Sequence, residues 1–468
     1  MKILGQHNSK AAVSFLLVFK DEPFPHYLLP LDKKLKEKCS GSFKEIYALE
    51  NQRTYLVGMG EKKKCTTEHI RRIAGVITGV VRALKEKTYY VPLTALPFPE
   101  EESARAFAEG ALFSLYAFDK YKKSAQEKKF FPDTCYLGTT KNITSVIDHA
   151  HILAENVIYV RDLVNEPAGV CTPSLLAAEA KALPLDVTVL GREQLQKLGM
   201  NGILAVSAGS AQEPKLITIL YAPAKPKRTI ALVGKGITFD AGGLDIKSTE
   251  NMDTMKSDMH GAATVLGVMR ALVQTKPNVR VIGVIAACEN LLGERAYKPR
   301  DIIIAHNKKT IEICNTDAEG RVILADALSY TAKKYAPDSI IDIATLTGAC
   351  IVALGKTTIG VMGNDEALIN NILASARETD EDAWQLPLSD KYRELVESDT
   401  ADVRNTGKDH PGAGAITAAA FLEQFTEGSA WAHLDIAGPA WTDKGNEYCP
   451  AGGTGCGVRL LAHLILSQ

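Results

Sequence analysis

Three apolar runs constrain the fold of this chain more than any other feature of its sequence. They cover residues 229–233, 279–287 and 339–344, are rich in β-branched side chains and are bounded by turn-forming residues. Residues 259–274 and 321–335 lie between these runs, and the first of the two repeats its apolar residues at helical spacing on one face. Strands without polar alternation are typical of a sheet that is covered on both faces. We therefore expect an α/β fold, with a mixed sheet between layers of helices.

The length of the chain predicts two domains. Its 468 residues exceed what one hydrophobic core usually organises. In the first part, the pattern predicts strands at residues 11–19 and 54–59 and helices at residues 69–85 and 102–121. A polar stretch with a proline and a glycine, residues 128–142, is the expected exit from this part, and a helix at about residues 145–164 follows. We expect a smaller N-terminal α/β domain over residues 1–147 and a larger domain over residues 148–468.

The charge of the chain is balanced, with 54 basic and 55 acidic side chains. Nothing global therefore attracts the protein to nucleic acid or to an anionic membrane. Lysine runs at residues 33–38, 62–64 and 120–129 contain few interleaved arginines or aromatic residues. We interpret them as solvated faces rather than as a nucleic-acid patch.

Cysteine usage and hydropathy favour a soluble protein in a reducing, cytoplasmic compartment. The nine cysteines form no Cys-x-x-Cys pair, which argues against a disulfide framework and against a thiolate zinc site. Residues 11–19 are apolar but are followed by Lys20-Asp21-Glu22-Pro23 rather than by a small-residue cleavage site, so we expect a strand there and not a signal peptide. No apolar stretch reaches the roughly 18–20 residues that a membrane span needs.

Two short segments concentrate charge next to the predicted strands. The first, residues 233–243, reads VGKGITFDAGG and continues towards residue 258, and the second, residues 315–321, reads NTDAEGR. Together they supply four carboxylates, those of Asp240, Asp258, Asp317 and Glu319. Divalent cations take carboxylate oxygens, and two such ions close together need a carboxylate that bridges them. Four anions so close would repel one another unless cations neutralised them, so the residues predict a metal centre.

Three basic residues in the same segments extend this prediction. Lys235 precedes Asp240 by one glycine-flanked turn, and a lysine beside a divalent cation has a lowered pKa, so its neutral amine can serve as a ligand. Lys247 is the better candidate for a charged group that donates to a carbonyl oxygen as this becomes an oxyanion. Arg321 keeps its proton and suits the holding of a small anion by its planar fork.

Some of these residues have alternative interpretations. Asp258 stands at the start of a helical pattern and could be a helix cap. Gly234 and Gly236 could belong to a phosphate loop, but the segment has neither the Gly-x-Gly-x-x-Gly pattern nor the Gly-Lys-Ser/Thr ending. His260 and His433 could be ligands or catalytic bases, although we favour a structural role for both.

At these positions the chain resembles the leucyl aminopeptidases, or cytosol aminopeptidases, of the M17 metallopeptidases. The segment NTDAEGR looks like the family signature in full, and residues 233–258 look like its first metal-binding stretch. Further likenesses are RDLVN at residues 161–165, ATLTGA at residues 344–349 and HLDIAGPAW at residues 433–441. Together these likenesses extend over nearly everything after about residue 150.

The resemblance implies a centre with two divalent metals per subunit, zinc or manganese, with cobalt or magnesium as alternatives. One metal would be held by Lys235, Asp240, Asp258 and Glu319, and the other by Asp240, Asp317 and Glu319. Lys247 would polarise the scissile carbonyl group, and Arg321 would hold a bicarbonate ion that acts as general base towards a water bridging the metals.

The resemblance also implies the substrate and the assembly. Peptides with a free N-terminus would be hydrolysed one residue at a time. Leu or Met would be preferred, because positions that match the family's first side-chain pocket are apolar or small: Met255, Leu346, Gly348 and Ala437. Family members usually form homohexamers, so we expect one here.

Two other functions remain open at this point. A two-metal phosphoesterase would use similar carboxylates but normally adds several histidine ligands, and His260 is the only histidine next to either segment. Some bacterial members of the family bind DNA as architectural proteins. The balanced charge makes nucleic acid the weaker expectation for a partner.

Overall fold

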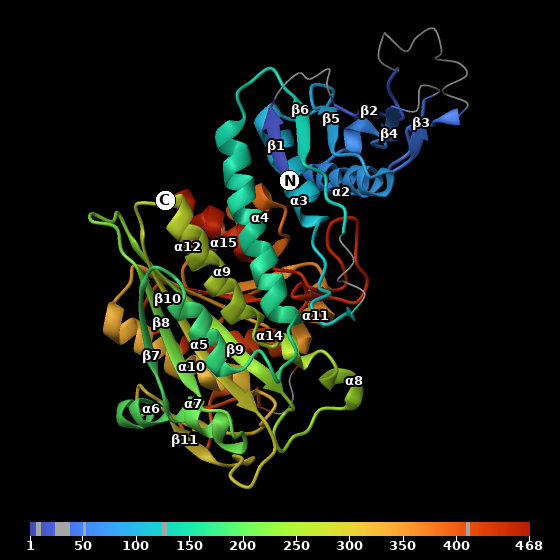
Figure 1. Cartoon of the computed structure of the whole chain (residues 1–468). Coiled ribbons are helices and arrows are strands. Elements are labelled where there is room, and N and C mark those ends of the chain that lie inside the picture. The colour runs from blue at the N-terminus through green and yellow to red at the C-terminus, as the bar shows by residue number, and fades with distance from the viewer. Residues whose placement is uncertain (6–10, 24–37, 50–52, 124–128, 409–411) are drawn as a thin grey trace. The chain divides into compact units, whose positions relative to one another are not determined.

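Strands and helices alternate through both parts of the chain (Figure 1). The computed structural model describes residues 1–5, 11–23, 38–49, 53–123, 129–408 and 412–468. Contacts divide the chain into two units. The first comprises Met1–Glu155 and Lys444–Ala451, and the second comprises Asn156–Asp443 and Gly452–Gln468. The long helix α4 (Thr144–Asn165) contributes residues to both.

The first unit contains a six-stranded sheet in the order β1-β6-β5-β2-β4-β3. All neighbouring strands are parallel except β3 and β4. The strands are β1 (Lys2–Gly5), β2 (Val13–Val18), β3 (Ile46–Ala48), β4 (Thr54–Gly58), β5 (Thr88–Pro92) and β6 (Thr134–Gly138). The helices of this unit that precede α4 and lie among the described residues are η2 (Lys62–Lys64), α2 (Thr67–Leu84) and α3 (Glu100–Phe113).

Two expectations for this unit were wrong. Residues 129–142 are not the exit from this unit, because they contain β6, which pairs with both β1 and β5. The predicted helix at residues 102–121 ends at Phe113, where the Ser114 hydroxyl donates to the carbonyl oxygen of Ala111 and competes with the helical pattern. Of the lysine runs, residues 33–37 and 124–128 lie outside the described residues.

The second unit contains an eight-stranded sheet in the order β15-β14-β17-β13-β9-β10-β8-β7. Its strands are β7 (Asp186–Leu190), β8 (Lys215–Tyr221), β9 (Thr229–Asp240), β10 (Arg280–Asn290), β13 (Ser339–Ala344), β14 (Ile359–Gly363), β15 (Ala383–Gln385) and β17 (Trp431–Asp435). The pairs of β9 with β10 and β13, and of β13 with β17, are parallel, whereas β8 is antiparallel to β10. The sheet is therefore mixed, as expected.

Smaller sheets and helices complete the second unit. Three strands form one small sheet, β11 (Ile302–Ile304), β12 (Thr310–Glu312) and β16 (Val403–Arg404), and two form another, β18 (Trp441–Thr442) and β19 (Gly452–Gly453). The described helices are α5 (Pro173–Lys181), α6 (Arg192–Leu198), α7 (Asn201–Val206), η4 (Ser207–Gly209), α8 (Thr249–Met252), η5 (Met255–Ser257), α9 (His260–Thr275), α10 (Glu319–Tyr335), α11 (Gly348–Leu354), α12 (Glu366–Thr379), α13 (Asp390–Arg393), η6 (Glu394–Val396), α14 (Gly414–Glu423) and α15 (Val458–Leu466).

Helices α9 and α10 cover opposite faces of the large sheet. Gly234 of β9 lies against Gly261 and Ala262 of α9, whereas its neighbour Val233 belongs to the apolar cluster of α10. Successive residues of a strand point to opposite faces. Most residues of both helices are buried, so the core extends around them. Each fully buried leucine there stabilises the fold by about 1.5–3 kcal/mol.

Three parallel strands end at one edge of this sheet. Strand β9 lies between β13 and β10, and all three end at the same edge. After β9 the chain forms β10 on one side of β9 and later forms β13 on its other side. The order of the strands therefore reverses at β9. Ligands of open α/β sheets bind at such a position. Among the residues that the structure describes, no helix combines the length and apolar character of a membrane span.

Candidate metal centre and active site

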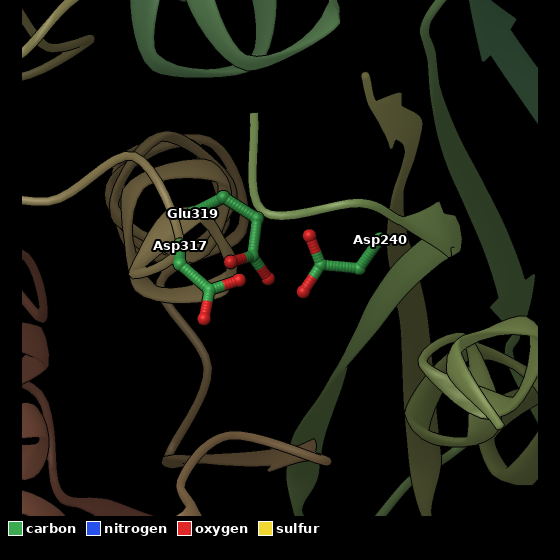
Figure 2. A group of neighbouring side chains, drawn as sticks. All are labelled: Asp240, Asp317 and Glu319. Carbon is green, nitrogen blue, oxygen red and sulfur yellow. The ribbon is translucent and has the colours of Figure 1, made fainter. Parts of the chain in front are cut away.

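The four predicted carboxylates lie at the edge where β9 ends. Asp240 is the last residue of β9, and Asp258 lies between η5 and α9. Asp317 lies in the turn before α10, and Glu319 is the first residue of that helix. Carboxylate oxygens of Asp240, Asp317 and Glu319 all lie within 4.8 Å of one another. Figure 2 shows these three carboxylate groups turned towards one another.

Two lysine ammonium groups lie among the carboxylates. Lys235 Nζ is 2.7 Å from Asp258 Oδ1 and 2.8 Å from Glu319 Oε1, and so joins Asp258 to the other three. Lys247 Nζ is 2.9 Å from Asp240 Oδ2 and 2.5 Å from Asp317 Oδ1. The structure thus brings together all five predicted metal ligands and Lys247.

Burial and mutual repulsion perturb the acids of this cluster. Burial, with repulsion from Glu319, raises the pKa of Asp240 to about 7. Burial also raises the pKa of Asp258 and of Asp317. For Glu319, burial would raise the pKa, but attraction to Lys235 and Lys247 outweighs it and the pKa is lowered. Acids with such different environments, gathered in one place, are typical of a functional site.

The neighbouring carboxylates raise the pKa of both lysines. Burial would lower the pKa of Lys235, but the charges of Asp258, Glu319 and Asp240 outweigh it and the pKa is raised. The same balance, with Asp240 and Glu319 as the main partners, raises the pKa of Lys247. The carboxylates therefore favour the charged form of both ammonium groups.

The residues of the cluster fit a pair of divalent cations. Carboxylates outnumber ammonium groups by four to two, so the cluster would carry an excess of negative charge with all four acids ionised. Asp258 Oδ2 is buried and has no hydrogen-bond partner among the described residues. A buried carboxylate oxygen without a donor is costly unless a cation approaches it. No other group of three or more His, Cys, Asp or Glu side chains with this spacing occurs in the described part of the chain.

Neighbouring side chains hold the carboxylates in place. Asn290, the last residue of β10, donates from Nδ2 to Asp240 Oδ1 (2.8 Å) and to the carbonyl oxygen of Thr316 (3.0 Å). The Tyr297 hydroxyl donates to the same carbonyl oxygen at 2.7 Å. The Thr345 hydroxyl donates to Asp258 Oδ1 at 2.7 Å. These residues were not predicted from the sequence. A polar residue at the end of a buried apolar strand could have indicated that Asn290 belongs to the site.

Gly320 gives Lys235 the space to reach Glu319. A Cβ atom at position 320 would lie 2.5 Å from Cε and 2.7 Å from Nζ of Lys235. Glycine therefore stands in the first turn of α10 for a steric reason, although it is unfavourable within a helix.

Arg321 lies in the first turn of α10, two residues after Glu319, and is 8% exposed. Burial lowers its pKa to about 10, against the opposing attraction of Glu319 and Asp435, so it stays charged at neutral pH. Its Nη1 donates to the carbonyl oxygen of Asn405 at 2.9 Å, the one hydrogen bond that its side chain makes among the described residues. The other donors of this fork are available to a small anion.

The predicted pocket residues lie in three segments. Met255 begins η5, three residues before Asp258. Leu346 and Ala437 are brought together by Asp435, whose Oδ1 accepts from both of their backbone N–H groups. Gly348 begins α11 and is exposed.

Neither candidate histidine belongs to the carboxylate cluster. His433 is fully buried on β17, with Nδ1 2.6 Å from Asp342 Oδ1, and the Trp431 indole donates to the other oxygen of that carboxylate. His260 is fully buried beside Cys456. The structural interpretation of both residues agrees with these surroundings.

The fold and the cluster define a class, an α/β enzyme with an acidic cation site at the carboxyl edge of its sheet. Comparison with known proteins identifies the family. The catalytic domain of the cytosol aminopeptidase family matches residues 158–462, and the N-terminal domain of the same family matches residues 37–125. The chain therefore belongs to the cytosol aminopeptidase family, the M17 metallopeptidases, and is a peptidase. The resemblance seen in the sequence is confirmed.

Individual relatives support this identification. A probable cytosol aminopeptidase of Persephonella marina is 45% identical over 423 residues, which cover 88% of this chain and 85% of the relative. One from Aquifex aeolicus is 45% identical over 419 residues, or 88% of this chain and 84% of that protein. Among solved structures, the bottromycin maturation enzyme BotP in complex with Mn superposes with a TM-score of 0.87 at 32% identity, over 98% of this chain and 99% of BotP.

Proposed function

We propose that this peptidase removes the N-terminal residue from peptides, with two divalent cations held by the carboxylate cluster. The observation that carries the proposal is the convergence of Asp240, Asp317 and Glu319 within 4.8 Å, next to the orphaned Asp258 Oδ2. One cation would take Lys235, Asp240, Asp258 and Glu319 as ligands, and the other Asp240, Asp317 and Glu319. Zinc or manganese fits this donor set, with cobalt or magnesium as alternatives. The Mn complex of BotP supports manganese.

The bound cations would lower the pKa of a water molecule between them and polarise the scissile carbonyl group of the substrate. The Lys247 ammonium group would donate a hydrogen bond to that carbonyl oxygen. It is 13% exposed beside Asp317, which at 30% is the most exposed of the four carboxylates. Substrate would therefore enter from the side of Asp317 and Lys247.

Arg321 would hold the general base of the reaction. Bicarbonate would supply the proton-accepting oxygen that the cluster lacks, since no histidine lies within it. The guanidinium of Arg321 suits a planar anion of this kind, because most of its donors have no protein partner and its charge is buried. The charge of Glu319 acts on the Arg321 guanidinium, so an anion bound there would lie near the cations.

Specificity would come from the free amino group and from a small apolar pocket. Binding of the neutral N-terminal amine by a cation would restrict hydrolysis to the first residue. The partly buried Met255, Leu346 and Ala437, with Gly348 leaving space beside them, would favour Leu or Met at that position.

Leu-p-nitroanilide and its N-acetyl counterpart test this function. We expect the protein to hydrolyse only the free-amine compound, to lose activity with a chelator and to regain it with Mn²⁺ or Zn²⁺. Glu319→Ala should be inactive, while Glu193→Ala, at an exposed position on α6, should match the wild type. Equal hydrolysis of the acetylated compound would exclude an aminopeptidase, and full activity of Glu319→Ala would exclude the site.

We also propose a cytoplasmic homohexamer, which the family resemblance supports. Light scattering coupled to size exclusion would measure six copies of the 468-residue chain. A monomer would contradict this assembly but would leave the proposed chemistry intact.

A further inference from the structure

The loop before α10 carries much of the proposed site, yet it has no regular structure of its own. Residues 314–318 lie between β12 and α10 and include Asp317, and Glu319 and Arg321 follow directly. Backbone N–H and C=O groups in such a loop need partners, because leaving them buried without one costs free energy. Those partners determine where the loop places its carboxylates.

One remote side chain supplies several of these partners. Asn405 follows β16 and is 0% exposed. Its Oδ1 accepts from the N–H groups of Cys314 (2.7 Å) and Asn315 (3.3 Å). Its Nδ2 donates to the carbonyl oxygens of Asn315 (2.7 Å) and Ala318 (3.4 Å).

The backbone of Asn405 also bonds to residues on either side of this loop. Its N–H donates to the carbonyl oxygen of Glu312 at 3.0 Å, and its carbonyl oxygen accepts from Arg321 Nη1 at 2.9 Å. Strand β16 pairs in parallel with β12, so that Glu312 is aligned with Arg404. Every polar atom of Asn405 is therefore bonded to residues 312–321.

We propose that Asn405 is a positioning residue that fixes Asp317 and Arg321 for metal and anion binding. An amide fits these contacts best. A carboxylate cannot donate to the carbonyl oxygens of Asn315 and Ala318, and an apolar side chain leaves the N–H groups of Cys314 and Asn315 without their acceptor. This inference rests on the proposed two-metal function.

The contacts predict an unequal effect on the two cations. Asn405 contacts the side of the loop that carries Asp317, whereas Lys235 and Asp258 are held by β9 and by Thr345. Loss of the amide should therefore weaken the cation of Asp240, Asp317 and Glu319 more than the cation that also has Lys235 and Asp258. Removal of a residue that supports metal ligands typically lowers affinity or activity about 10- to 100-fold.

The test compares Asn405→Ala with Asn364→Ala. Asn364 is a matched control in the same unit, because its side-chain amide also bonds to remote backbone groups. It accepts from the N–H of Trp431 (2.8 Å) and donates to the carbonyl oxygen of Ser429 (3.1 Å). Binding of Mn²⁺ is measured by the electron paramagnetic resonance signal of free Mn²⁺ during titration, and kcat, KM and the bicarbonate requirement are measured with Leu-p-nitroanilide.

We expect Asn405→Ala to weaken one of two Mn²⁺ sites about 10- to 100-fold, to lower kcat more than it changes KM and to need more bicarbonate. Asn364→Ala should alter only thermal stability. Wild-type Mn²⁺ affinity and bicarbonate response in folded Asn405→Ala would overturn the inference. If that variant does not fold, Asn405→Asp, which keeps the acceptor and loses both donated bonds, is judged by the same criteria. Failure of the proposed function would instead appear in the wild-type protein as fewer than two bound Mn²⁺ ions.

Discussion

Replacement of Lys247 by methionine should change metal affinity and catalysis in opposite directions. Its ammonium group lies 2.9 Å from Asp240 Oδ2 and 2.5 Å from Asp317 Oδ1. Both carboxylates are proposed metal ligands, so an incoming cation has to displace the ammonium group. Methionine keeps most of the length of the side chain and removes the charge.

The distances allow the size of both effects to be worked out. At an effective dielectric constant of about 20, each contact corresponds to about 6 kcal/mol of attraction before the cost of desolvation. The net value of a hydrogen bond to a charged group is smaller, about 1.5–3 kcal/mol. Relief from that competition should tighten Mn²⁺ binding about 10- to 100-fold. Loss of the donor to the developing oxyanion should lower kcat about 100- to 1000-fold.

Titration with Mn²⁺ and steady-state hydrolysis of Leu-p-nitroanilide measure the two effects in one preparation. Wild type and variant are compared at one fixed pH and one bicarbonate concentration. Lys197→Met, at an exposed position on α6, is the control for loss of a lysine charge. Weaker Mn²⁺ binding by Lys247→Met, or an unchanged kcat, would refute the reasoning.

Three further predictions concern other residues. Glu319→Gln should lower the number of Mn²⁺ ions retained after dialysis by more than Asp258→Asn, because Glu319 would bridge both cations; equal metal contents in the two variants would contradict the ligand assignment. Arg321→Met should lose the response to bicarbonate in CO₂-depleted buffer, and a wild-type response would show that the anion binds elsewhere. The pKa of Glu447 is lowered from 4.5 to about 2, chiefly by its hydrogen bonds with Arg72, so its stabilising contribution is present above pH 4.5 and is lost as the pH falls towards 2. Glu447→Gln should therefore cost about 1 kcal/mol in urea unfolding at pH 6 and less at pH 3, and a cost that did not shrink with acid would contradict the ion pair.

The elements that could be predicted from the sequence are those that a short stretch of neighbouring residues identifies. The runs that became β9, β10 and β13 are apolar throughout because helices cover both faces of the sheet, and that property is visible in any short window. Strand β6 was missed because it is five residues long and stands in a stretch with Pro132 and Gly138. Its place in the sheet depends on pairing with β1, more than 130 positions earlier in the chain.

The same distinction applies to the site. Asp317, Glu319 and Arg321 were found because one short segment contains them. Asn405 has no such signal, since its partners are backbone groups about 90 positions earlier and its own neighbours follow no periodic pattern. Side chains that support a site by bonding to remote backbone are visible only when the chain is folded.

The contact between Gly320 and Lys235 has a consequence for how sequences of this family should vary. A methyl group at position 320 would occupy the volume of the lysine's terminal carbon and nitrogen. Alanine, the more favourable residue in a helix by about 1 kcal/mol, is therefore excluded by a side chain 85 positions earlier rather than by the helix itself. Where a relative carries a shorter residue at the position of Lys235, the constraint on the glycine disappears. Positions 235 and 320 should accordingly covary: a lysine at position 235 requires a glycine at position 320.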